Sequence, residues 1–157
     1  MPDMPDHDYA RELRQALSGM FSVEGTSLGH WSRPAHQLRL ANMCLRGEGG
    51  ARDYRMAGSL FEALAGAGSN AYFAGLQHYC FWVFYTTGQG SSYWIGSPNN
   101  MRYDDAPHRR KAAKHAKRAR KYLKKAAGWR PKAGVPGRSE WQIERAKFLL
   151  NEVSSSG

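Results

Sequence analysis

The hydrophobic residues gather in helix-length segments, and the densest segment spans residues 71–85 (AYFAGLQHYCFWVFY). Seven of its side chains are aromatic, and its apolar side chains point in nearly all directions around a helix. A helix that is apolar on all sides is buried on all sides. The segment is too short, and Gln77 and His78 are too polar, for a membrane span. We therefore predict that it is the central helix of a helical domain.

Apolar side chains at intervals of three and four residues predict further helices on both sides of this segment. Stretches rich in Gly, Pro and Ser separate them, as expected of helix ends and turns. The pattern is typical of an all-α protein with about six helices and no sheet of consequence. The predicted helices cover residues 7–20, 32–46, 54–68, 70–87, 106–127 and 139–150.

A stretch rich in Gly, Ser, Pro and Asn, residues 88–105, separates the central helix from the next one. It contains Tyr93 and Trp94, and a loop of this length is usually functional or mobile. Its aromatic side chains either fill the edge of the core or are offered to a binding partner.

The helix predicted at 106–127 has one apolar stripe on an otherwise basic surface. Small side chains and one leucine recur at intervals of three and four residues, and most other positions are Lys or Arg. We expect the stripe to face the core and the basic side chains to face solvent. The stripe consists of Ala112, Ala116, Ala119, Leu123 and Ala126.

The last predicted helix begins at Ser139, where Gln142 completes a capping-box pattern. Its apolar side chains, Trp141 and Phe148 among them, are expected to supply contacts with the core. We interpret this helix and the one at 7–20 as caps for the two ends of the domain. The C-terminal tail SSSG, residues 154–157, is expected to be frayed.

The positive charge is confined to one part of the chain. The whole sequence carries a formal net charge of +10, from 23 basic and 13 acidic residues. Residues 102–132 hold 13 of the Lys and Arg residues and only Asp104 and Asp105, a balance of +11. The rest of the chain has 10 basic and 11 acidic residues, a balance of −1. An electrostatic partner is therefore expected to meet the 102–132 segment.

Residues 36–70 are predicted as two helices joined by a Gly47-x-Gly49 turn, an order typical of helical repeats. This stretch resembles a Sel-one-like repeat, a relative of the tetratricopeptide repeat. Seven residues fall on positions of that family's pattern: Leu40, Gly47, Gly49, Asp53, Ala57, Ala65 and Gly68. Six positions depart from it: His36 and Leu64 replace Ala, Ala41 replaces Gly, Cys44 replaces Tyr, Gly50 replaces Val, and Leu60 replaces an aromatic residue.

A second, interrupted copy of the pattern follows the first. Tyr85-Thr-Thr-Gly88-Gln-Gly90 is similar to the repeat's turn, and Ala119-x-x-Tyr122-x-x-Lys125-Ala126-Ala127 is similar to its second helix. The resemblance implies one domain over 1–157, a short α-solenoid of antiparallel helix pairs, tetratricopeptide-like. Its parts would be an N-terminal cap and loop at 7–31, repeats at 32–68 and 69–127 with an insertion at 88–118, and a C-terminal cap at 139–150.

The resemblance also implies a protein that binds other proteins and has no activity of its own. Bacterial members of the family serve as adaptors, as secretion-linked factors and as immunity proteins that neutralise toxins. The motifs agree with a non-enzyme, since there is no nucleophile motif, no phosphate loop and no paired carboxylates on one helix face. We expect no cofactor and no metal, because the six histidines show no HxxxH or HExxH spacing.

Cys44 and Cys80 are expected to be buried thiols. The N-terminus lacks the basic and then apolar regions of a signal peptide, so we expect a cytoplasmic protein without a membrane partner.

Three interpretations of the basic helix stay open: a solvated surface, a site for an acidic protein such as a toxin or effector, and a nucleic-acid site. The acidic protein is the leading hypothesis, and a nucleic-acid-binding accessory protein is the alternative. The candidate partner-binding residues are Arg109, Arg110, Lys111, Lys114, Lys117, Arg118, Lys121, Lys124, Tyr93 and Trp94.

Overall fold

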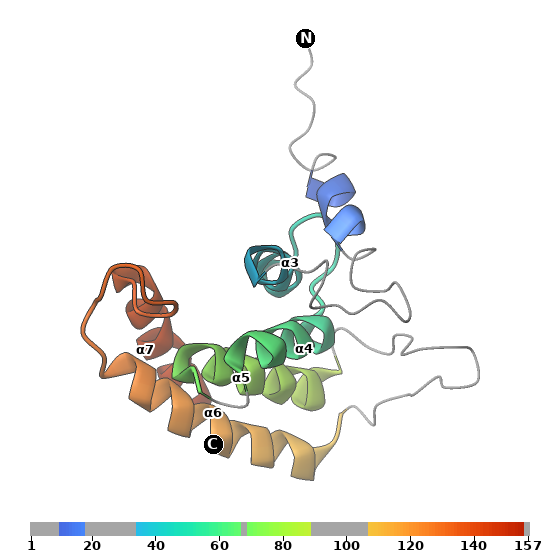
Figure 1. Ribbon diagram of the computed structural model, residues 1–157. Coiled ribbons are helices and arrows are strands. Elements are labelled where there is room, and N and C mark those ends of the chain that lie inside the picture. The colour runs from blue at the N-terminus through green and yellow to red at the C-terminus, as the bar shows by residue number, and fades with distance from the viewer. Residues whose placement is uncertain (1–9, 18–33, 67–68, 89–106, 156–157) are drawn as a thin grey trace.

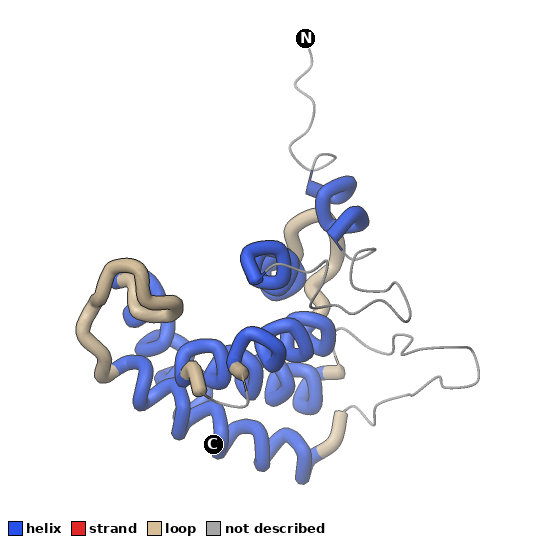
Figure 2. Tube along the Cα trace, in the orientation of Figure 1, coloured by secondary structure: helices blue, strands red, loops and turns tan. Residues whose placement is uncertain are grey.

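The computed structural model describes residues 10–17, 34–66, 69–88 and 107–155, and all its regular elements within them are helices (Figures 1 and 2). This confirms the prediction of an all-α protein. A short helix covers residues 10–17. The longer helices are α3 (Pro34–Arg46), α4 (Tyr54–Ala65), α5 (Ala71–Thr87), α6 (Arg109–Ala127) and α7 (Glu140–Ser155). Within these ranges, no helix has the length and apolarity needed to cross a membrane.

Side-chain caps fix where the helices begin. The carboxylate of Asp53 accepts a hydrogen bond of 2.9 Å from the Met56 amide at the start of α4. The Asn70 side chain accepts from two amides at the start of α5. Ser139 donates to the Gln142 side chain through its amide and its hydroxyl, and the bond from the amide is the half of the predicted capping box in which Gln142 reaches back to the start of α7. These bonds satisfy amides that have no partner within the helix.

The basic helix α6 begins at Arg109, three residues later than predicted. His108 sets this boundary: its amide donates to the Tyr85 carbonyl at the end of α5, over 2.7 Å. Its ring Nδ1 accepts from the Lys111 amide and caps the helix. The backbone bond to Tyr85 ties the start of α6 to the end of α5.

Helix α5 is the centre of the molecule and contacts α4, α6 and α7. Most of its side chains are buried, as its continuous apolar sequence predicted. Phe84 is 1% exposed and Leu76 is fully buried. The helix was predicted to be buried on all sides, but Trp82 departs from this, because its ring is only half-buried against the core.

Helix α6 runs back along α5 in close contact (Figure 1). Tyr85, near the end of α5, meets the start of α6, whereas Gly75, near the beginning of α5, meets Leu123 near the end of α6. A Cβ atom on Gly75 would lie 2.6 Å from the Leu123 Cδ2 atom, so only glycine permits this separation of the two helices.

Helix α7 forms side-chain hydrogen bonds with both α5 and α3. The Tyr79 hydroxyl of α5 donates to the Glu152 carboxylate over 2.5 Å, and Arg145 donates to the Asn42 side chain of α3 over 3.1 Å. The helix continues to Ser155, so Ser154 and Ser155 are helical and the prediction that they are frayed was wrong.

The helix at 10–17 is attached to the turn between α3 and α4. The Arg14 guanidinium donates to the carbonyls of Glu48 and Ala51 in that turn, over 3.1 and 2.6 Å. Gly49 has a φ of +73°, and a side chain there would clash with the backbone of Ala10. Glycine is therefore required both by the turn and by the neighbouring helix.

Candidate binding surface on helix α6

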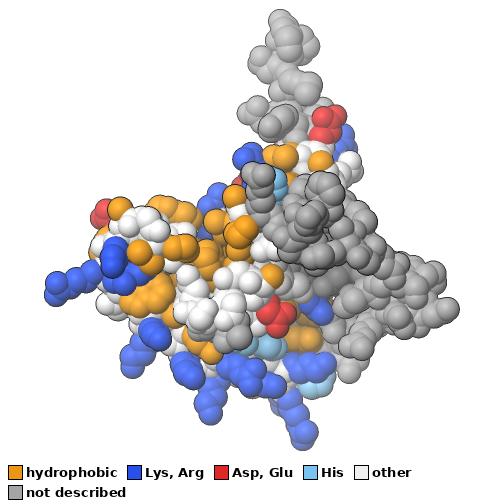
Figure 3. Space-filling view, viewed as in Figure 1, with side chains coloured by type: hydrophobic (Ala, Val, Ile, Leu, Met, Phe, Trp, Pro, Cys, Tyr) orange, Lys and Arg blue, Asp and Glu red, His pale blue; other side chains and the backbone are white. Residues whose placement is uncertain are grey.

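The apolar stripe of α6 faces the core, as the sequence predicted. Ala119, Leu123 and Ala126 are fully buried against the rest of the molecule, and Ala112 and Ala116 are less than 10% exposed. The helix has ten Lys and Arg residues and no Asp or Glu. The burial of the stripe therefore turns most of this charge towards solvent, where Figure 3 shows Lys and Arg side chains in a row over α6.

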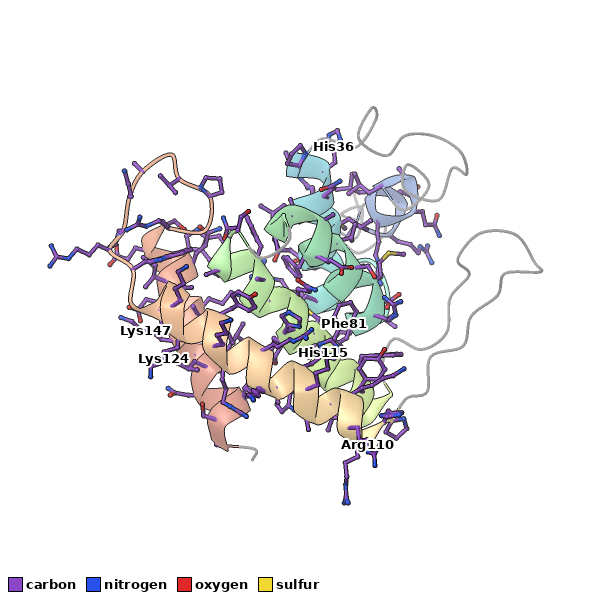
Figure 4. The ribbon with its side chains drawn as sticks, turned by 60° about the horizontal axis from the view of Figure 1, so that its bottom comes forward. His36, Phe81, Arg110, His115, Lys124 and Lys147 are labelled. Carbon is purple, nitrogen blue, oxygen red and sulfur yellow. The ribbon has the colours of Figure 1, made fainter. Side chains whose placement is uncertain are left out.

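Seven of the predicted partner-binding residues are exposed along this helix, and Lys111 is half-buried. Arg110 points away from the molecule in Figure 4. Tyr93 and Trp94 lie outside the described residues. We call the positions directly opposite the buried stripe the outer row: Arg110, Lys114, Lys117, Lys121 and Lys124. The row extends from residue 110 to residue 124, and these 14 steps of 1.5 Å give a length of roughly 21 Å.

Beside the outer row lies a second line of side chains, in which basic groups alternate with rings. We call this line the flank row: Lys111, His115, Arg118, Tyr122 and Lys125. His115 and Tyr122 are half-buried and meet the rings of α5, whereas Arg118 and Lys125 are exposed. In Figure 4, His115 points from α6 towards the side of Phe81, and their ring centroids are 5.2 Å apart.

The rings of the flank row belong to a column of four stacked rings between α5 and α6. Tyr122 stacks on His78 (centroids 5.7 Å apart), His78 on His115 (5.2 Å), and His115 on Tyr85 (5.6 Å). Lysine ammonium groups lie over its two end rings: Lys121 is 5.4 Å from the Tyr122 centroid and Lys111 is 5.3 Å from that of Tyr85. Tyr85 is buried and Tyr122 is half-buried, so Tyr122 is the more accessible end.

The two histidines in the column share a hydrogen bond. Their Nδ1 atoms are 2.9 Å apart, so one ring donates a proton and the other accepts it. Burial lowers the pKa of each imidazole to about 4. The charges of Lys114 and Arg118 act in the same direction, and each imidazole is therefore neutral near pH 7.

Motif spacing within single helices does not predict this pair of histidines. His78 and His115 are 37 residues apart and meet only because α6 runs back along α5. The described residues contain no group of three or more His, Cys, Asp or Glu residues that could hold a metal ion. The nearby Lys114 and Arg118 would repel a cation from the pair.

The predicted buried cysteines are confirmed. Cys44 and Cys80 are free thiols with almost no exposed surface. Burial raises the pKa of the Cys44 thiol to about 11, and burial also raises the pKa of Cys80. Both therefore stay protonated at neutral pH, which is the state of a structural rather than a reactive cysteine.

Two large rings on α7 face solvent, which contradicts their predicted contacts with the core. Trp141 is 53% exposed and Phe148 is 66% exposed. They are seven residues apart and so lie on the same face of the helix. The opposite face, which includes Ile143, Ala146 and Leu149, carries the core contacts.

The chain matches no protein-family model, no curated protein and no solved structure. The resemblance to Sel-one-like repeats therefore stays a prediction.

Proposed function

We propose that this chain is a non-catalytic binding protein whose outer row on α6 recognises an acidic protein partner. The observation that carries this proposal is the placement of charge. A helix with ten basic residues and no acidic one buries its small apolar stripe and leaves the opposite side cationic. Such a surface steers an acidic partner and accelerates its association.

The proposal includes the finer architecture that the repeat resemblance implies. Each helix from α3 to α7 contacts the next one, and α5 also contacts α7. These contacts support a short tetratricopeptide-like solenoid, with α3 and α4 as one repeat and α5 and α6 as the next. In that arrangement an acidic toxin or effector is the partner class that the resemblance implies, and the protein acts as an adaptor or immunity protein.

The exposed rings of α7 supply apolar contacts, which a purely charged surface lacks. Protein interfaces bury a few aromatic anchors at their centre, and the charged residues lie mainly at the rim. Trp141 and Phe148 are rings of this kind on a helix that packs against α6. We propose that they contact the same protein partner, with the basic side chains acting through longer-range attraction.

A pull-down from native lysate tests this proposal when it is combined with charge reversal. Replacing Lys114, Lys117, Lys121 and Lys124 with Glu changes the net charge by −8, from +10 to +2. Each of these side chains is exposed, so each change should alter the free energy of unfolding by no more than about 0.5 kcal/mol. We expect the wild-type protein to retain a protein partner after nuclease treatment, and the variant to lose it.

A matched pair of single variants controls for net charge alone. Arg39→Glu on α3 and Lys117→Glu on α6 change the charge equally, and both residues are exposed. The proposal predicts weaker capture for Lys117→Glu than for Arg39→Glu. Equal capture by the wild-type protein and a folded quadruple variant would show that the outer row is only a solvated surface.

A further inference from the structure

In addition to the protein partner, we propose that the flank row of α6 binds single-stranded nucleic acid, with Tyr122 stacking on an unpaired base. This is a different class of ligand, and it depends on the ring at Tyr122 rather than on the outer row alone. Cations and rings alternate along the flank row, in the order Lys111, His115, Arg118, Tyr122, Lys125.

The stacked column provides a platform for a base at its Tyr122 end. His78 covers one side of the Tyr122 ring, in nearly parallel planes that differ by 7°. The Lys121 ammonium lies 5.4 Å from the ring centroid. A base that takes the place of the Lys121 ammonium over this half-buried ring adds a fifth ring to an existing column. The platform is rigid, because three further rings support it from behind.

Basic side chains stand on both sides of this platform, where they can contact the phosphates on either side of a stacked base. Arg118 lies four residues before Tyr122 and Lys125 lies three residues after it, or roughly 6 Å and 4.5 Å along the helix axis. Both are exposed, as is Lys121. Proteins that bind single strands without sequence preference use this combination of a cationic track and aromatic platforms.

The cationic track continues beyond the end of α6. Arg130 and Lys132 are exposed in the segment that follows, and Trp129 is half-buried there. The guanidinium of Arg138 lies 5.4 Å from the centroid of the Trp129 ring and donates to the Arg130 carbonyl, which holds this segment in place. Cations and a ring therefore recur in the segment that follows α6, where the chain turns away from the helix axis (Figure 1), so the cationic surface is longer than a compact anion needs.

An unpaired strand fits this surface better than a duplex or an acidic protein. Stacking on Tyr122 requires a base whose face is free, and a duplex offers such faces only at its ends. The proposed protein partner takes its apolar contacts from Trp141 and Phe148 on α7, whereas the flank row offers cations and rings without an aliphatic side chain. Nucleic-acid interfaces, in contrast, are strongly positive and polar.

Fluorescence anisotropy with the full chain tests the proposal. The probes are a labelled 12-nucleotide oligothymidylate, an oligouridylate of the same length and a 12-base-pair duplex, with polyglutamate as a competitor. We expect both single strands to bind more tightly than the duplex. Tyr122→Leu removes the ring but keeps an apolar side chain, and should weaken single-strand binding by about tenfold. Tyr122→Phe keeps the ring and should retain binding.

Lys125→Ala and Lys124→Ala form a matched pair, since both remove one exposed lysine near the end of α6. Lys125 belongs to the flank row, so its loss should weaken single-strand binding more than the loss of Lys124. This pair tests the proposal even where Tyr122→Leu is poorly folded. Equal effects of the two variants would overturn the proposal. So would a duplex that binds as tightly as the single strands, or polyglutamate that competes as well as an unlabelled strand.

These results are distinguishable from failure of the protein-partner proposal. Tyr122→Leu should leave nuclease-resistant capture of an acidic protein unchanged, since that capture depends on the outer row. Capture of a protein with no oligonucleotide binding would overturn this inference and leave the proposed function standing.

Discussion

The contact between Gly75 and Leu123 makes the packing of α5 on α6 sensitive to a single methyl group. Gly75→Ala would place a Cβ atom 2.6 Å from Leu123 Cδ2 and 3.3 Å from the Leu123 amide nitrogen. The side chain can move, but the nearby backbone cannot move without separating the helices. We expect a loss of about 1–3 kcal/mol in the free energy of unfolding, the usual effect of overpacking a core. Urea denaturation measures it.

Gly128→Ala is the matched control for this change. Gly128 has ordinary helical φ and ψ angles of −87° and −2°. A Cβ atom there would be 3.6 Å from its nearest neighbours, a normal van der Waals distance. The stability of the Gly128→Ala variant should stay close to that of the wild-type protein. A loss as large as that of Gly75→Ala would mean that the close packing at Gly75 is not the cause.

The histidine pair should make the protein less stable in mild acid. An unfolded histidine has a pKa of about 6.5, whereas both folded imidazoles have a pKa of about 4. Between these values the unfolded chain binds more protons than the folded one, so the free energy of unfolding falls as the pH falls from about 6.5 to 4. No further loss from this pair is expected below pH 4.

Thermal unfolding at pH 7.5, 6 and 4.5 tests this pH dependence, with His115→Gln for comparison. The positive charges of Lys114 and Arg118 lower the pKa of both rings, and that of Lys111 lowers the pKa of His115, so all three disfavour a protonated pair. The variant has one titrating ring fewer and should lose less of its unfolding temperature between pH 7.5 and 4.5. The same loss in both proteins would assign the acid sensitivity to other groups.

At the scale of single residues, the sequence predicts the burial or hydrogen bonding of a side chain when the residues that determine it lie on the same helix. The buried alanines of α6 follow from the spacing of small residues along one helix, and so does the Ser139–Gln142 cap. The His78–His115 bond does not, because it depends on the register between two helices. That register could have been approximated only by pairing the end of α5 with the start of α6.

At the scale of elements, the side chains of α5 differ in burial, and this difference predicts how much stability each one contributes. Phe84 is 1% exposed and Trp82 is half-buried. Phe84→Ala should therefore lower the free energy of unfolding by about 3–5 kcal/mol, the range for deleting a buried aromatic ring. Trp82→Ala should have a smaller effect. Guanidinium titrations of the two variants measure the difference, and a larger loss at Trp82 would contradict the packing of α5 described above.

The last helix shows why an element could be predicted without its orientation. Its existence follows from the capping box and from apolar residues at helical spacing. Trp141 and Phe148 are apolar, but they lie on the face opposite Ile143, Ala146 and Leu149. Which apolar face packs inward depends on where α5 and α6 lie, and the sequence of α7 alone contains no information on that.

At the scale of the whole molecule, the concentration of charge on one helix predicts how binding responds to salt. Surface charges that attract a partner over distance are screened when the ionic strength rises. The association rate of the protein partner should therefore fall as the salt concentration rises from about 50 to about 300 mM. The dissociation rate should change less. Surface plasmon resonance measures both rates, and the quadruple Lys→Glu variant should show a much flatter response.

Salt-independent association of the wild-type protein would contradict a role for the outer row. The apolar contacts of Trp141 and Phe148 would then have to account for the binding. Replacing both rings with Ser would test this directly, because exposed side chains can be changed with little effect on the fold.

The hydrogen bond between Arg145 and Asn42 can form only late in the synthesis of the chain. These residues are 103 positions apart, and α5 is synthesised well before α6 and α7, which cover it. A growing chain therefore holds a strongly apolar helix without these two neighbours until α6 and then α7 have left the ribosome. A chain that stops before α6, which begins at Arg109, keeps that surface open permanently, and such chains should aggregate or be degraded rather than accumulate as shorter binding proteins.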